Sequence, residues 1–220
     1  MEISITLIII VATSIISFIA FSNHKLLDQF IFYPPAVRRG QVYRFFSCGL
    51  IHADWGHLIF NMISLYLFGE AVESKFMEAF GPLGKLVYLG MYVLALAASV
   101  IPTYINNKDN YHYRSLGASG AVSAVIFAGI LFFPLSQLGL FFIPIYVAGF
   151  IFGLIYLLVS GWLDRRGGGN INHSAHIFGA LFGVGFTIIA CQGFSDYPVL
   201  TSFVDAIKNV ELSQLIQFGP

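Results

Sequence analysis

The chain is dominated by long runs of apolar residues that short polar segments interrupt. A helix that crosses a membrane needs about 20 mainly apolar residues, and six charge-poor runs approach this length. They cover residues 3–22, 55–73, 83–103, 116–134, 138–160 and 173–193. The pattern predicts an all-α, polytopic membrane protein with six transmembrane helices in one domain.

The fourth and fifth runs belong to one uncharged stretch, from Ser115 to Leu163, which is too long for a single crossing. Pro134, Ser136 and Gln137 lie inside this stretch and predict the turn between two helices. The first run has no Lys or Arg before it and is too long for the apolar part of a signal peptide. We therefore expect it to be a retained transmembrane helix.

Two segments outside the runs mix apolar and charged residues. The long loop at 23–54 combines aromatic residues and prolines with three arginines, which is typical of a segment in the bilayer interface. The tail at 195–220 has apolar positions at helical spacing, namely Leu200, Phe203, Ile207 and Val210. We expect a membrane domain at 1–194 with a partly embedded first loop, and then a tail that is either a short interfacial helix or frayed.

Composition agrees with the membrane class and narrows the chemistry. Of the 220 residues 57% are hydrophobic and 10% charged, with a mean hydropathy of +0.80, which is more apolar surface than a soluble core of this size uses. Eleven basic residues balance eleven acidic ones, so we expect no nucleic-acid partner. Cys48 and Cys191 lack metal or redox spacing. We expect neither a cofactor nor a bound metal.

Polar residues at membrane depth are costly, so each calls for a partner or a purpose. His52, His57 and Asn61 lie at the start of the second run. Residues 57 and 61 are about one helical turn apart, so their side chains share a face.

The sixth run carries a histidine on a stripe of glycines. His176, Gly179 and Gly183 recur at helical spacing, so another helix can approach the imidazole closely. The fourth run offers a matching small surface of Gly117, Gly120 or Ala121, Ala124 and Ala128, and Ser119 lies at the start of this run. We expect these two helices to pack together, with Ser119 within reach of His176.

This pairing suggests nucleophilic catalysis. A serine hydroxyl is a poor nucleophile until a base accepts its proton, and a neutral imidazole accepts it near neutral pH. Attack on an amide carbonyl creates an oxyanion that needs donors already aimed at it. His57, Asn61 and the backbone N–H of Ser119 are the candidates. No acidic residue lies deep in any run to orient His176, so we expect a Ser-His dyad.

Three motifs, in this order along the chain, resemble a known family. They are the H-x4-H-x3-N pattern of His52, His57 and Asn61, then Gly117-Ala118-Ser119-Gly120, then Ala175-His176-x-x-Gly179-x-x-x-Gly183. Similar pieces are Arg39–Arg44 before the second run and Gly69–Glu73 at its end. Over about residues 30–195 the chain is similar to rhomboid intramembrane serine proteases.

The resemblance implies a six-helix rhomboid-like bundle that cuts single-pass transmembrane proteins within or near the membrane. Ser119 would be the nucleophile and His176 the general base, while His57 and Asn61 would stabilise the oxyanion. A peptide bond inside a helix is shielded by its own hydrogen bonds. The expected partners, besides the lipid bilayer, are therefore transmembrane substrates with helix-destabilising segments that contain Gly or Pro.

The resemblance also assigns supporting roles. His52, with Gly117 and Gly120, would shape the pocket, and Arg44 and Glu73 would be structural polar anchors. Substrate gating would fall to the fifth helix and the Gly167–Asn172 loop.

One departure from the family pattern affects the base. Some members carry a tyrosine four residues after the nucleophile, packed on the catalytic imidazole, whereas this chain has Ser123. Another residue must hold the ring here, and an aromatic of the fifth helix is the candidate.

Two other functions fit parts of the pattern. Each motif taken alone is typical of helix packing, so a non-catalytic rhomboid-like protein that binds membrane helices is one alternative. A metal-dependent membrane enzyme is the other, with ligands from the four histidines at 52, 57, 173 and 176. The sequence does not contain the H-E-x-x-H motif that zinc proteases carry on a helix.

We expect a multi-pass protein in the plasma membrane of a bacterium, but its orientation is open. With a cytoplasmic amino terminus, the inside loops hold three Lys and Arg residues and the outside loops eight. The positive-inside rule then predicts the inverted protein, whereas the resemblance implies a site that opens outward. Reporter fusions after Asp109 and after Arg166 distinguish the two orientations.

Overall fold

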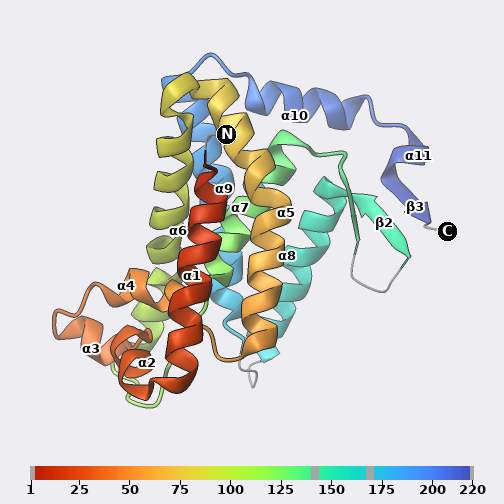
Figure 1. The fold of residues 1–220 in the computed structure, drawn as a ribbon. Helices are drawn as coiled ribbons and strands as arrows, with labels where there is room; N and C mark the ends of the chain where they lie inside the picture. The colour runs from red at the N-terminus through yellow and green to blue at the C-terminus, as the bar shows by residue number, and fades with distance from the viewer. Residues whose placement is uncertain (1–2, 140–143, 167–170, 219–220) are drawn as a thin grey trace.

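The computed structural model describes residues 3–139, 144–166 and 171–218, and its main feature is a bundle of long helices (Figure 1). The bundle contains α1 (Ile5–Ser22), α5 (Trp55–Phe80), α6 (Gly84–Asn107), α7 (Ser119–Phe132), α8 (Gly149–Arg166) and α9 (His173–Phe194). Most side chains of α7 are buried on all sides, which makes it the central helix. Its sequence of small and apolar residues has no polar face that would keep it at a surface.

Several of these helices are suited to crossing a membrane. By length and composition, the suitable stretches of the described chain are α1, α9 and the segment Trp55–Asn107, in which the short 3-10 helix η2 (Gly81–Leu83) joins α5 to α6. α7 is apolar but shorter, at 14 residues. The helices indicate an integral membrane protein. In the described residues the long helices follow one another in the predicted order, but only α1, α9 and the Trp55–Asn107 segment meet the length and composition of a membrane span.

The fifth predicted helix, at 138–160, is wrong at its amino-terminal end. β1 (Gln137–Gly139) and β2 (Ile145–Ala148) pair antiparallel there, and α8 begins only at Gly149. Pro144 would lie inside a helix that began at 138, where it removes a hydrogen bond and clashes with the preceding turn. The β-branched Ile145 and Val147 favour the strand that follows it.

The tail is folded and reaches back to this hairpin. α10 (Val199–Lys208) crosses the end of the bundle and buries Val199 against α7 and α9, and α11 (Leu212–Leu215) leads into β3 (Ile216–Phe218) (Figure 1). β3 pairs antiparallel with β2, and Gln137 Nε2 donates to the carbonyl of Gln214 at 2.7 Å. The described part of the tail, up to residue 218, therefore consists of two helices and a strand.

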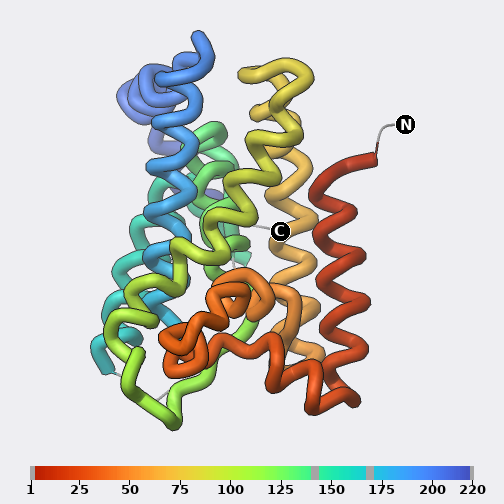
Figure 2. Tube along the Cα trace, turned by 90° about the vertical axis from the view of Figure 1, so that its left-hand side faces the viewer, coloured from red at the N-terminus to blue at the C-terminus, as the bar shows by residue number. Residues whose placement is uncertain are grey.

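The first loop is compact and mostly helical. α2 (His24–Phe30), α3 (Pro34–Arg38), α4 (Arg44–Ser47) and the 3-10 helix η1 (Cys48–Leu50) pack against α1 and α6 at one end of the bundle (Figure 2). The buried Arg44 holds them together, because its guanidinium donates to the carbonyls of Asp28 and Ile31 at 2.8 and 2.6 Å. Arg44 is thus a structural anchor.

Glu73 is the second polar anchor and ties α1 to α5. Its carboxylate accepts hydrogen bonds from the backbone N–H groups of Ile5 and Thr6 and from the hydroxyls of Ser4 and Thr6, at 2.8–3.0 Å. These N–H groups are the unpaired donors at the amino terminus of α1, where a negative charge also meets the positive end of the helix dipole. These four hydrogen bonds satisfy the buried carboxylate.

α7 and α9 pack backbone to backbone through the predicted small residues. A Cβ atom on Gly179 would overlap the carbonyl of Gly120, and one on Gly183 would overlap Ala124. Between these points no side chain separates the two helices. This contact sets the distance between the first turns of α7 and α9.

We predict that Gly179→Ala destabilises the protein, because the added methyl group must push α7 and α9 apart. Overpacking of this kind typically costs about 1–3 kcal/mol. Thermal unfolding of the purified protein in detergent should show a lower Tm. Gly185→Ala on the same helix is the matched control, since no heavy atom lies within 4 Å of its Cβ position. Equal Tm values for the two variants would contradict the packing argument.

Candidate active site

Ser119 occupies the first position of α7, directly after a sharp turn. Gly117 has φ +115°, a conformation that residues with a side chain rarely adopt. The space of a Cβ atom there is taken by the His57 ring. The Gly117 N–H also donates to the carbonyl of Cys48 at 2.9 Å, which fixes the turn to the first loop. Glycine at 117 thus lets the chain pass beneath His57 and turn into α7.

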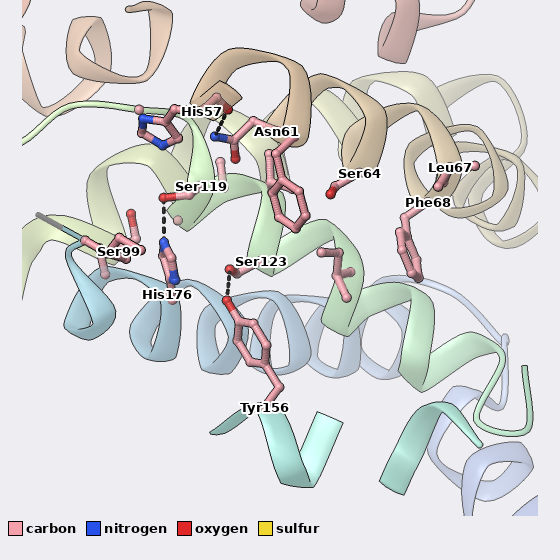
Figure 3. Close-up of a pocket in the computed structure, with 18 of the residues that line it drawn as sticks. His57, Asn61, Ser64, Leu67, Phe68, Ser99, Ser119, Ser123, Tyr156 and His176 are labelled. Carbon is pink, nitrogen blue, oxygen red and sulfur yellow. Dashed lines mark hydrogen bonds between the residues drawn. The ribbon is translucent and has the colours of Figure 1, made fainter. Parts of the chain in front are cut away.

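His176 meets Ser119 from the first turn of α9. Its Nε2 lies 2.7 Å from Ser119 Oγ, and Figure 3 shows the ring and the hydroxyl facing each other. This is the distance of a direct hydrogen bond, along which a proton can pass. The predicted proximity of Ser119 and His176 is confirmed.

The start of α9 is fixed by Asn172, a residue that sequence reasoning missed. Its Oδ1 accepts from the N–H of Ala175 at 3.0 Å, and its Nδ2 donates to Thr103 Oγ1 at 3.1 Å and to Ser115 Oγ at 3.4 Å. Asn is a preferred N-cap residue, so its place before the sixth run was a usable signal. Asn172 links α9 to α6 and to the segment that leads into α7. Residues 167–170 of the predicted gating loop lie outside the described residues.

His57 and Asn61 lie on α5, across the cavity from His176 (Figure 3). Asp54 caps this helix, because its side chain accepts from the N–H of His57 at 2.8 Å. Asn61 is buried, and its Nδ2 donates to the carbonyl of His57 at 2.9 Å, which uses one of its two N–H groups. The structure therefore brings both predicted donors to the cavity that contains Ser119.

His52 lies behind this wall and does not line the cavity. Its Nε2 accepts from the N–H of Ala118 at 3.3 Å, so the ring hydrogen is on Nδ1, which donates to Ser17 Oγ at 2.9 Å. Ser17 in turn donates to the carbonyl of Leu50 at 2.9 Å. Burial, together with the neighbouring His57, lowers the pKa of His52 to about 3. The neutral ring supports the turn before Ser119.

The cavity has a volume of about 1310 Å³ and lies between α5 and α8, with α7 behind it. It extends from His57 and Ser119 to Tyr146 on the hairpin, and Gly117 and Gly120 form part of its wall. A Cβ atom on Gly120 would overlap the side chain of Ser99, so glycine here keeps α6 and α7 close.

An aromatic residue of the fifth helix does lie beside the imidazole, as expected. Tyr156 of α8 has its ring centroid 6.4 Å from that of His176, with 22° between the planes. Its hydroxyl lies 3.0 Å from Ser123 Oγ (Figure 3).

The four histidines do not form one metal site. Both ring nitrogens of His52 are engaged within the protein, and His176 Nε2 faces Ser119. Among the residues that the structure describes, no three His, Cys, Asp or Glu side chains are grouped to hold an ion. In the described residues, the arrangement of these histidines therefore does not support the alternative of a metal-dependent enzyme.

We predict that His52 makes stability depend on pH. Its pKa in the folded protein is about 3 against an ordinary 6.5, so only the unfolded chain binds its proton between these values. The contribution of His52 to the free energy of unfolding is fully present above pH 6.5. It falls as the pH drops toward 3, by up to about 1.4 kcal/mol per pH unit. The Tm of wild type should therefore fall more steeply below pH 6.5 than that of His52→Gln.

His24→Gln is the control for this pH dependence, because His24 is exposed. Its Tm should follow that of wild type at every pH. Parallel curves for wild type and His52→Gln would show that His52 does not stay neutral in the folded protein.

Comparison with known proteins identifies the family. Residues 39–193 match the family model of the Rhomboid domain. The chain is 30% identical to RHOMBOID-like protein 12, mitochondrial, of Arabidopsis thaliana over 73% of this chain and 50% of that protein. It is 31% identical to Rhomboid-related protein 1 of Caenorhabditis elegans, over 80% of this chain and 47% of that protein. It is 26% identical to Putative rhomboid protease YdcA of Bacillus subtilis, over 73% of this chain and 73% of that protein.

The chain thus spans about half the length of the first two relatives and a larger share of the third. The matched region contains the second to sixth long helices and every residue gathered around Ser119, apart from Ser17 on α1. The chain belongs to the rhomboid family.

Proposed function

We propose that the protein is an intramembrane serine endopeptidase with a Ser119–His176 dyad. The observation that carries the proposal is the 2.7 Å contact between Ser119 Oγ and His176 Nε2 beside a large cavity. A serine that only allowed helices to pack would not need a histidine at hydrogen-bond distance, nor an opening in front of it.

The reaction begins when His176 Nε2 accepts the proton of Ser119 as Oγ attacks the scissile carbonyl carbon. The carbonyl oxygen becomes an oxyanion, which accepts hydrogen bonds from Asn61 Nδ2, the His57 ring and the Ser119 backbone N–H. Collapse of this intermediate breaks the C–N bond, and His176 gives its proton to the leaving amine. Water then attacks the acyl-enzyme with His176 again as base, which releases the acid and restores Ser119.

The substrates we propose are single-pass transmembrane proteins with segments that unwind easily. The cavity between α5 and α8 is lined mainly by apolar and small residues, which suits a polypeptide that arrives from the bilayer. A helical segment must unwind before its carbonyl can reach Ser119, so Gly or Pro near the cut lowers the barrier. In this proposal six helices cross the membrane, and the first loop lies partly embedded in it.

As part of the same proposal, the protein resides in the plasma membrane of a bacterium. Its membrane domain is 1–194, and the tail 195–220 lies at the interface. The similarity to the relative from the bacterium Bacillus subtilis, which covers 73% of both chains, supports a bacterial source. The similarity to the mitochondrial plant protein covers only 50% of that protein.

We predict that Ser119→Ala and His176→Ala each abolish two measurable activities. One is labelling of the detergent-solubilised protein by a fluorophosphonate probe, which reports an activated serine. The other is cleavage of a test transmembrane substrate with a Gly-rich segment, in vesicles. Both should fall by at least about a thousandfold, because neither partner of a dyad works alone.

Ser202→Ala is the matched control, since it makes the same change at an exposed position on α10. It should keep full labelling and cleavage. If wild type with an intact Tm is neither labelled nor active, the non-catalytic binder of membrane helices becomes the better description. Cleavage that survives in Ser119→Ala would exclude a serine mechanism.

We predict that Asn61→Ala mainly lowers kcat, by about a hundredfold, because its amide would contact the oxyanion and not the ground-state carbonyl. KM for the same substrate should stay within about twofold. Steady-state kinetics in vesicles measure both values. Tyr66→Leu, an exposed position on the same helix, serves as control. An Asn61→Ala effect confined to KM would assign the amide to substrate binding instead.

A further inference from the structure

Tyr156 is the link between the base and the wall of the cavity. The Tyr156 ring is nearly parallel both to His176, at 22°, and to Phe152 one turn earlier on α8, at 23°. It also contacts Phe127 of α7, with ring centroids 5.6 Å apart. A series of rings thus runs from α8 to the imidazole of α9.

The hydroxyl group of Tyr156 fixes this ring to α7. It lies 3.0 Å from the hydroxyl of Ser123, which is buried one helical turn after Ser119 (Figure 3). The helix that carries the nucleophile therefore also anchors the ring that lies beside the base. Ser123 is small enough to leave room for a tyrosine that arrives from α8.

The His176 ring has few other constraints. In the described part of the chain, Ser119 is its hydrogen-bond partner, and His173 meets it edge-on with centroids 5.9 Å apart. A dyad has no carboxylate to orient its imidazole through the second nitrogen. The plane of the ring must then be set by packing, and Tyr156 supplies a flat surface nearly parallel to it.

We propose that Tyr156 is a positioning residue that holds the His176 imidazole with Nε2 toward Ser119, and that Ser123 anchors it through their hydroxyl contact. The inference rests on the function proposed above. Because Tyr156 belongs to α8, which also walls the cavity, the orientation of the base depends on where α8 lies. A shift of α8 away from α7 would remove the ring from His176 and break the contact with Ser123.

The experiment compares variants that remove the ring with variants that remove only the hydroxyl contact. Tyr156→Leu should lower kcat by about ten- to a hundredfold with little change in KM, since misorientation of a catalytic group affects the reaction and not binding. Tyr156→Phe and Ser123→Ala should each lower kcat only about two- to tenfold, the usual range for one hydrogen bond. Tyr66→Leu on α5 is the matched control and should leave kcat unchanged.

Two combinations separate positioning from general stability. Tyr156→Phe with Ser123→Ala should be no worse than either change alone, because both remove the same contact. Ser123→Tyr with Tyr156→Leu returns a ring from α7, at the position where some rhomboid proteases carry a tyrosine. In this double variant, log kcat should recover by at least about half of the decrease that Tyr156→Leu causes.

The outcomes also distinguish this inference from the function on which it rests. Wild-type kcat in Tyr156→Leu, with Ser119→Ala inactive, overturns the positioning role alone. So does a loss of kcat in Tyr156→Leu that follows a fall in Tm and is not recovered by Ser123→Tyr. Full cleavage by Ser119→Ala would instead overturn the proposed function.

Discussion

The close contact between α7 and α9 is the constraint on which the site depends. Apolar side chains cannot drive two helices together in lipid, where the surroundings are equally apolar, so small residues and direct backbone contact must do so. Gly179 and Gly183 lie against Gly120 and Ala124 without a side chain between them. A larger residue at Gly179 or Gly183 would overlap the backbone of α7 and push the two helices that carry Ser119 and His176 apart.

The polar groups of the bundle fall into two kinds. Glu73, Arg44 and His52 are buried, and their polar atoms are paired within the protein, mostly with backbone groups at helix ends and in the first loop. They satisfy the backbone where it is not helical, as a membrane requires. Ser119, His57 and Asn61 instead border the cavity. The buried residues thus pair within the protein, whereas Ser119, His57 and Asn61 face open space.

The sequence predicted those features that have a local period or motif. Small residues on the fourth and sixth runs indicated the α7–α9 contact, and the spacing of His57 and Asn61 placed both on one wall. The hairpin before α8 was missed because the run is apolar throughout, and apolar content alone does not separate strand from helix. Pro144 and the β-branched residues that follow it were the signals for a strand. The partner of the imidazole could be assigned to the fifth helix but not to Tyr156, since several aromatic residues there have similar spacing. Which of them faces His176 depends on the rotation of α8, a tertiary property.

α8 is held at two levels. At its amino-terminal end it continues directly from β2, which pairs with β1 on one side and with β3 of the tail on the other. Near its middle, Gly153 lies against Phe127 and Ile130 of α7, and Tyr156 contacts Ser123. Its outward face, with Leu154 and Leu158, is exposed in a helix bundle that indicates a membrane protein. In the proposed function, a polypeptide that enters between α5 and α8 meets a wall held by a sheet at the amino-terminal end of α8 and by a tyrosine near its middle. If His176 is the base, as proposed, the stability of that wall and the orientation of the His176 ring depend on the same few contacts.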